Sequence, residues 1–108
     1  MKLNLIERIL INNLLPRQDC YFTTLIVVQD IDKKVIVNQQ ELVDFEIKTD
    51  ENGDLKWNKK GDEYEVDIDF TDLEKTIIKE QLEDLNKRKK LNLNYIRIFK
   101  YFECEEII

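Results

Sequence analysis

The spacing of the apolar residues changes in the middle of this chain, and the change restricts the folds open to it. Apolar residues recur at helical spacing over residues 3–36 and again after residue 71, but alternate with charged residues between 45 and 70. A helix repeats about every 3.6 residues and a strand every two, so the middle segment is typical of strands. The sequence therefore predicts an α+β fold in which helices flank a small three-stranded antiparallel β-meander.

Three strands are expected within residues 45–70. Asn52-Gly53 can form a type I′ hairpin turn, since both residues tolerate a positive φ. The strand before this turn contains Phe45 and Ile47, and the return strand contains Leu55 and Trp57. Residues 59–62 are expected to form a second turn. The third strand then places four apolar side chains on one face: Tyr64, Val66, Ile68 and Phe70.

Helices are expected on both sides of the meander. The first covers about residues 3–14 and ends before Pro16, because a residue that precedes proline disfavours the helical conformation. Residues 21–36 are ambiguous. The run from Leu25 to Val28 suits a buried strand, whereas the apolar spacing through the polar stretch that follows is typical of a helix. We favour the helix here, and the strand stays open.

The later helices carry recognisable start signals. Asn38 with Glu41, and Thr71 with Glu74, have the spacing of capping boxes. Asn92 is expected to cap the last helix, and the tail over residues 103–108 is expected to fray. The stripe expected to be buried on the helix after residue 71 is Leu73, Ile77, Leu82 and Leu85. The stripe expected on the last helix is Tyr95, Ile96, Phe99 and Phe102.

The composition indicates one domain that spans residues 1–108. The chain is 43% apolar and 37% charged, which are globular values, and two glycines and one proline leave little room for a linker. No run of apolar residues is long enough to cross a membrane, and no cleavable signal peptide is expected. Cys20 and Cys104 show no metal or disulfide spacing, so buried, reduced thiols in a cytoplasmic protein are expected.

The chain contains neither histidine nor serine. A Ser-His-Asp or Cys-His catalytic set therefore cannot form, and neither can a site in which histidine binds zinc or haem. Glu65, Asp67 and Asp69 could share one strand face and hold magnesium or a basic ligand, but we favour the simpler explanation, a polar strand face in water. We therefore expect a protein that is not an enzyme and binds no cofactor or metal.

Charge is distributed unevenly along the sequence. Residues 41–74 contain thirteen acidic and four basic side chains, a net charge of −9, and residues 75–102 contain three acidic and eight basic ones, a net of +5. An acidic surface of this kind can steer a basic partner. The acidic surface would be built by Glu65, Asp67 and Asp69, and the basic patch by Lys87, Arg88, Lys89 and Lys90. An overall charge of −6 argues against nucleic acid as the partner.

Two aromatic residues of the hairpin region are candidates for the binding surface. Trp57 is the only tryptophan. On a half-buried hairpin a tryptophan is most often a core anchor, but Trp57 and Tyr64 together could form an exposed hot spot, since both residue types are enriched in interfaces. Both interpretations stay open at this stage.

Several short segments together resemble a group of small uncharacterised proteins encoded by bacteriophages and prophages. The segments that carry the resemblance are Glu7-Arg8, Leu14-Leu15-Pro16, Thr24-Leu25, Gly53 with Trp57-Asn58, Lys90-Leu91, and residues 98–102. The resemblance covers most of the chain and implies a phage origin and an α+β domain, but no activity.

These observations favour a function in binding. The leading hypothesis is a small acidic phage or prophage accessory protein that binds another protein, such as a host or defence factor, through the acidic hairpin face. The alternative is a structural protein that self-associates through its acidic and basic parts into a homo-oligomer.

Overall fold

The computed structural model describes residues 1–104. Its elements in chain order are β1 (Lys2–Asn4), α1 (Leu5–Leu14), α2 (Phe22–Val35), α3 (Gln39–Asp44), β2 (Lys48–Thr49), β3 (Leu55–Lys56), α4 (Lys59–Glu63), β4 (Glu65–Asp67), α5 (Asp72–Lys87), the 3-10 helix η1 (Leu93–Tyr95) and α6 (Ile96–Tyr101). Within residues 1–104, no helix has the length and apolar character needed to cross a membrane.

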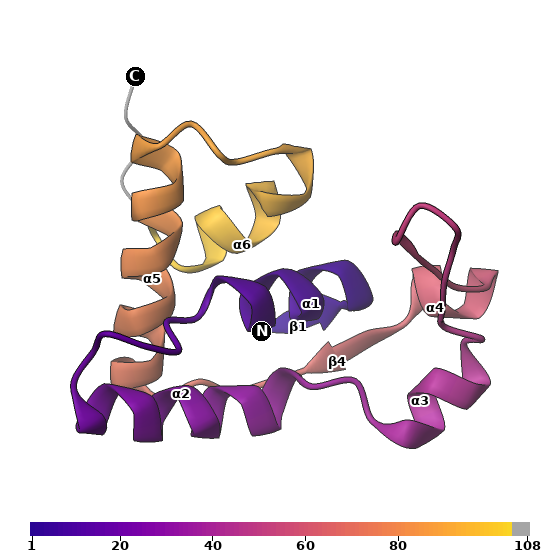
Figure 1. The fold of residues 1–108 in the computed structure, drawn as a ribbon, viewed down its shortest axis with the longest axis horizontal. Helices are drawn as coiled ribbons and strands as arrows, with labels where there is room; N and C mark the ends of the chain where they lie inside the picture. The colour runs from indigo at the N-terminus through magenta and orange to yellow at the C-terminus, as the bar shows by residue number, and fades with distance from the viewer. Residues whose placement is uncertain (105–108) are drawn as a thin grey trace.

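Four helices form the body of the molecule. In Figure 1, α1 lies at the centre, α2 runs below it, α5 rises at the left and α6 lies above. Their apolar faces meet in one core, in which Ile11, Ile31, Ile78, Leu82 and Ile98 are fully buried. Burial of aliphatic side chains of this size stabilises the fold by about 1.5–3 kcal/mol each.

The strands form two sheets of two strands each, in place of the expected meander. β2 pairs with β3 as the expected hairpin, but β4 pairs antiparallel with β1, with Leu3 opposite Val66. The expected second turn is the short helix α4. It carries the chain away from β3, so β4 meets the N-terminal strand. The α+β class is confirmed, whereas the three-stranded pairing was wrong.

The hairpin turn also differs from the expected type. Gly53 has a φ of +83°, but Asn52 is not among the residues with positive φ, so the turn is not type I′. The side chain of Asp50 organises the loop instead. Its Oδ1 accepts hydrogen bonds from the backbone N–H groups of Asn52 (2.9 Å) and Asp54 (3.0 Å).

The ambiguous segment is a helix, α2, and both expected capping boxes are present. α1 begins at Leu5, two residues later than expected, because Asn4 caps it. The Asn4 side chain accepts from the backbone N–H of Glu7, and the Glu7 carboxylate accepts from the backbone N–H of Asn4. The preceding residues are therefore left extended to pair with β4.

Two residues expected in the buried stripes are exposed. Leu73 in the first turn of α5 and Ile96 at the start of α6 face solvent, and the buried positions of α6 are Ile98 and Phe102. The last helix is preceded by η1, capped by Asn92 as expected, and this extra turn rotates the register of α6. The expected fraying concerns mainly residues 105–108, which lie outside the described residues.

Three helices end in the same way without using glycine. Glu46, Lys89 and Glu103 follow α3, α5 and α6 with φ values of 51°, 58° and 53°. In each case two backbone N–H groups bond back to the last turn in the Schellman pattern, as when Lys89 N–H donates to Asn86 (3.1 Å) and Lys90 N–H to Leu85 (2.9 Å). A left-handed conformation costs a non-glycine residue about 1 kcal/mol, so these three ends are locally strained.

Residues 38–64 form a separate unit that we call the hairpin lobe. It comprises α3, β2, β3 and α4, lies at the right of Figure 1, and contributes no residue to the core cluster of the body. Its own packing is centred on Phe45, whose ring lies 4.7 Å from that of Tyr64. Gly61 packs so closely that a Cβ atom there would lie 2.8 Å from Trp57 Cδ1 and 3.1 Å from Leu5 Cδ1.

Candidate functional site

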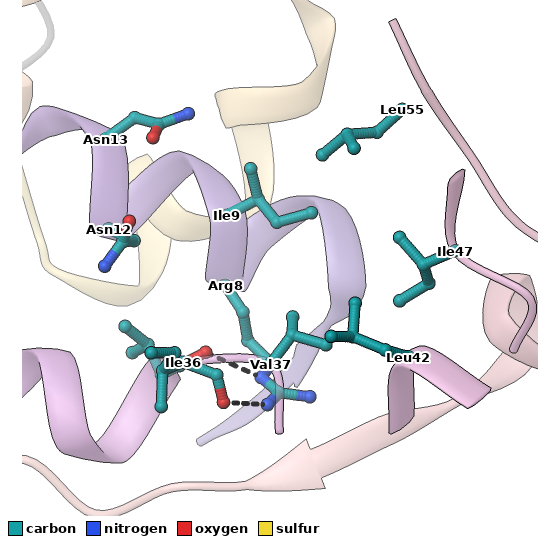
Figure 2. A pocket seen from close by; sticks show the side chains of 10 residues that line it. Arg8, Ile9, Asn12, Asn13, Ile36, Val37, Leu42, Ile47 and Leu55 are labelled. Atoms are coloured by element: carbon teal, nitrogen blue, oxygen red, sulfur yellow. Dashed lines mark hydrogen bonds between the residues drawn. The ribbon is translucent and has the colours of Figure 1, made fainter. Parts of the chain in front are cut away.

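A groove separates the body from the hairpin lobe and is the main candidate site. It encloses about 310 Å³. Its lining residues are Arg8, Ile9, Asn12, Asn13, Val35, Ile36, Val37, Leu42, Ile47 and Leu55. Figure 2 shows aliphatic side chains from α1, the end of α2, α3, β3 and the residue before β2 that surround one space. The volume is at the lower end of the range for ligand pockets, which is about 300–1,000 Å³.

The lobe wall of the groove is built by the end of α3. Ile47 N–H donates to the carbonyl of Leu42 (3.1 Å), closing the helix in the Schellman pattern. That motif commonly brings the apolar side chains of its first and last residues into contact. Here these are Leu42 and Ile47, and both line the groove. Leu55 on β3 extends the wall and Ile36 lies opposite, with 44% and 59% of their surfaces exposed. The groove is therefore apolar and open to solvent.

Arg8 closes the inner side of the groove. It is only 3% exposed, and Nε donates to the carbonyl of Val35 (3.0 Å) while Nη2 donates to that of Ile36 (2.7 Å). Nη1 and Nη2 donate to the two carboxylate oxygens of Glu41 at 2.7 and 2.9 Å. The guanidinium thus caps the end of α2 and holds the start of α3. Because its charge is neutralised within the chain, Arg8 does not provide an anion site.

The pairing shifts the titration of Glu41. Its hydrogen bonds with Arg8, supported by the backbone N–H of Asn38, hold its pKa below the usual 4.5 although burial opposes ionisation. The carboxylate is therefore charged at neutral pH. A buried ion pair with this geometry positions the lobe against the body and is costly to break from one side.

The same arrangement occurs at two other helix starts. Glu7 and Glu74 occupy the third position of α1 and α5, complete the capping boxes there, and are buried like Glu41. Each contacts a cation from a distant element: Arg97 Nε lies 3.5 Å from Glu7, and Lys34 Nζ lies 2.6 Å from Glu74. These contacts are structural, and they account for all the buried carboxylates within residues 1–104.

Two carboxylates of the expected acidic row are already paired with cations of the chain itself. Glu65 accepts from Arg97 (2.8 Å), and Asp67 pairs with the amino group of Met1 (2.9 Å), which holds the pKa of Asp67 below its usual value. The Asp69 carbonyl accepts from Lys34 (2.9 Å). All three residues are exposed. Within residues 1–104, no cluster of carboxylates and thiols has the geometry of a metal site.

The two aromatic candidates pack within the hairpin lobe. Trp57 is half-buried and its Nε1 donates to Asp62 (2.6 Å), while Tyr64 stacks on Phe45 and keeps 38% of its surface exposed. Neither lines the groove. The structure therefore gives both residues a packing role in the lobe that carries the groove, and their role in binding stays a prediction.

The basic run lies far from the groove. Lys87, Arg88, Lys89 and Lys90 are all exposed at the end of α5, at the upper left of Figure 1, and Arg88 pairs with Asp84 (2.9 Å). Leu93 and Ile96 are exposed shortly after the run. The basic run and the hairpin lobe thus lie at opposite ends of the molecule.

The two thiols are only partly buried, in contrast to the expectation that both are buried. Neither Cys20 nor Cys104 forms a disulfide within the described residues. Burial, with a contribution from Glu83, raises the pKa of the Cys104 thiol to about 11. This thiol is therefore protonated and a poor nucleophile at neutral pH.

Most of the groove was not anticipated from the sequence. Ile9, Ile36 and Leu42 are aliphatic residues in segments that favour helix, and such residues are usually core residues. The available signal was Glu41, whose place in a capping box next to apolar residues marks the start of α3, but its partner Arg8 lies 33 residues away. No family model matches the chain, and neither a curated protein nor a solved structure is detectably similar to it.

Proposed function

We propose that the protein acts by binding another protein, without catalysis, and that the groove beside the hairpin lobe is the binding surface. The observation that carries the proposal is the exposed aliphatic lining, in which Ile36, Leu42 and Leu55 are each more than a third exposed. Exposed apolar surface that is contiguous and framed by polar residues is typical of interaction sites.

Two features support binding over other uses of the groove. Its ionisable lining residue, Arg8, makes four hydrogen bonds within the chain and pairs with Glu41, so the groove offers no activated acid, base or nucleophile. The lobe is also held by a buried ion pair, which presents the apolar wall in a fixed position before a partner arrives. A preformed site reduces the ordering cost of association.

The proposed binding surface is therefore the groove and not the acidic row, and the acidic segment of residues 41–74 contributes Leu42, Ile47 and Leu55 to its lining. A role as a phage or prophage accessory protein, with a host or defence factor as the partner, stays a prediction that rests on the resemblance.

The proposal is tested with matched aspartate substitutions. Ile36→Asp and Leu55→Asp place a charge in the groove, and Leu73→Asp places one on an equally exposed apolar residue of α5. We expect all three variants to fold, and the groove variants alone to lose specific partners in affinity capture followed by mass spectrometry. Equal capture by all variants would contradict the use of the groove.

Self-association is the second candidate, favoured by the exposed basic run at the far end of the molecule from the acidic lobe. Light scattering coupled to size exclusion tests it in low and high salt. A head-to-tail assembly would dissociate to a 13.1 kDa monomer as salt is added. A monomer at every salt concentration would exclude this candidate.

A further inference from the structure

We infer that the groove takes a basic segment of a partner protein, one with aliphatic or aromatic anchors and with lysine or arginine on the side that faces the hairpin lobe. The inference rests on the proposed function and adds the chemistry of the partner. It follows from a difference in charge between the two walls of the groove.

The lobe wall is acidic. Residues 39–56 contain six carboxylates and two lysines, a net charge of −4. Arg8 neutralises Glu41, and Lys56 lies 3.6 Å from Asp50, so these two carboxylates are compensated. The remaining charged residues of this segment are Asp44, Glu46, Glu51, Asp54 and the one cation Lys48, a net charge of −3.

The body wall is uncharged apart from the neutralised Arg8. Residues 9–13 of α1 and residues 35–38 at the end of α2 contain only aliphatic residues and asparagines. Glu46 and Asp54 directly adjoin the lining residues Ile47 and Leu55, and neighbouring Cα atoms are about 3.8 Å apart. The carboxylates of these two residues therefore lie no more than about one screening length, 8 Å at physiological salt, from the backbone of a lining residue on the lobe side of the groove.

The size of the groove sets the number of anchors. An apolar cavity of about 150 Å³ holds one benzene ring, so a space of about 310 Å³ accommodates two side chains of that size. A segment with two apolar anchors on one face and cations on the flank would bury the aliphatic lining and place its charge against the lobe. Such a segment fits the groove better than an acidic or wholly apolar one.

The test uses three synthetic amphipathic peptides with the same leucine face and with lysine, glutamate or glutamine on the polar face. Binding to the whole protein is measured by titration calorimetry, and the site is located by amide chemical shifts. We expect the lysine peptide to bind most tightly and to shift the groove residues. Weakening by Leu55→Asp would confirm that the apolar anchors use the groove.

Charge reversal distinguishes attraction of the peptide by the hairpin lobe from attraction by the net charge of the whole protein. Glu51→Lys with Asp54→Lys changes the lobe wall from −3 to +1, and neither side chain makes an ion pair within residues 1–104. Asp30→Lys with Glu80→Lys makes the same change in net charge on α2 and α5, away from the groove. We expect the double substitution in the lobe to weaken the binding of the lysine peptide about tenfold at low salt. The double substitution on α2 and α5 should weaken it less.

The outcomes distinguish the two proposals. If the glutamine or glutamate peptide binds the groove as tightly as the lysine peptide, the groove binds protein segments but the inference about charge is wrong. Equal weakening by both charge-reversal pairs would also overturn the inference. If no peptide shifts the groove residues and the captured partners do not depend on Ile36 and Leu55, the proposed function itself falls.

Discussion

Three glutamates of this protein each have two structural roles. Each carboxylate at the third position of α1, α3 and α5 caps its helix and also receives a cation from a distant part of the chain. The capping hydrogen bond contributes about 1 kcal/mol. The ion pair depends on the exposure of the cation, because a solvated cation gains little from its partner. The three ion pairs should therefore contribute unequally to the free energy of unfolding, although the capping motifs are alike.

Glutamine substitutions measure that difference, because glutamine preserves the capping box and removes the charge. Glu41→Gln leaves the buried Arg8 without a counter-charge, and we expect it to lower the free energy of unfolding by about 3–5 kcal/mol. Glu74→Gln and Glu7→Gln leave the part-exposed cations Lys34 and Arg97, and the loss should be about 1 kcal/mol. Urea denaturation followed by far-ultraviolet circular dichroism, which reports the helices of the body, gives the values. Equal losses would show that burial of the cation does not set the energy.

Acid sensitivity belongs to the same residues. Burial opposes the ionisation of Glu74, but the hydrogen bonds from Lys34 and from the Thr71 backbone outweigh it and hold its pKa below the usual 4.5. A carboxyl whose pKa is lowered by folding stabilises the folded state above its unfolded pKa, and the stabilisation is lost as pH falls through the folded pKa.

We therefore expect the free energy of unfolding to fall as the pH drops below the ordinary carboxyl pKa of 4.5. The fall should be smaller in Glu74→Gln than in the wild type, because one linked proton is removed. Glu80→Gln, an exposed position on the same helix without an ion-pair partner in the described chain, is the matched control. Denaturant titrations at several pH values give the slopes. The same slope in Glu74→Gln and the wild type would contradict the assignment.

At the level of the secondary-structure elements, the C-terminal ends of the helices were harder to predict from the sequence than their starts. Capping boxes at Asn38 and Thr71 predicted two starts correctly, because side-chain capping has a spacing that can be read. The ends of α3, α5 and α6 lack the usual glycine signal, since Glu46, Lys89 and Glu103 adopt the left-handed conformation instead. The turn before Ile96 rotated the expected stripe for a related reason, namely that a 3-10 turn changes the period.

A glycine at these ends should stabilise the protein. We expect Lys89→Gly to raise the free energy of unfolding by about 1 kcal/mol, because glycine adopts the observed φ of 58° without steric cost. Lys89→Ala removes the same charge but keeps the Cβ atom, and should give no such gain. Thermal and urea denaturation of the two variants provide the comparison. A gain in both would assign the effect to charge rather than to backbone strain.

Pairing over long distances could not be read from the sequence at all. The alternation in residues 45–70 predicted three strands, and the structure has three much shorter ones there, β2, β3 and β4, which leave out Phe45, Ile47 and Trp57. The alternation carries no information about the partner strand. β4 pairs with residues more than sixty positions earlier, and Arg8 reaches Glu41 across 33 positions. The groove results from both contacts, so neither its shape nor its lining follows from local patterns.

The whole molecule consists of a body with a continuous core and a smaller hairpin lobe outside that core. The lobe buries Phe45 and Gly61 but few other side chains, and its strands are two residues long. Regions with few buried contacts open at lower free energy than the core does. The lobe should therefore open before the body unfolds.

Amide hydrogen exchange measures this difference. We expect the amides of β2, β3 and α4 to exchange faster than those of α2 and α5, and Glu41→Gln to speed exchange in the lobe more than in the body. The reason is that Arg8 and Glu41 form the buried polar contact between the two parts. Uniform exchange across lobe and body would show that they open as one cooperative unit.

The attachment of the lobe has a consequence for protein engineering. The chain enters the lobe where Arg8 holds the carbonyls of Val35 and Ile36, and it leaves where Asn4 pairs with Glu65. Asn4 caps the start of α1 and Arg8 lies about one helical turn further along, so both connections are fixed by one short stretch of the body. The hairpin lobe between these two connections can therefore be treated as an exchangeable segment. Its recognition surface can be redesigned or exchanged while the scaffold that carries it keeps its own sequence.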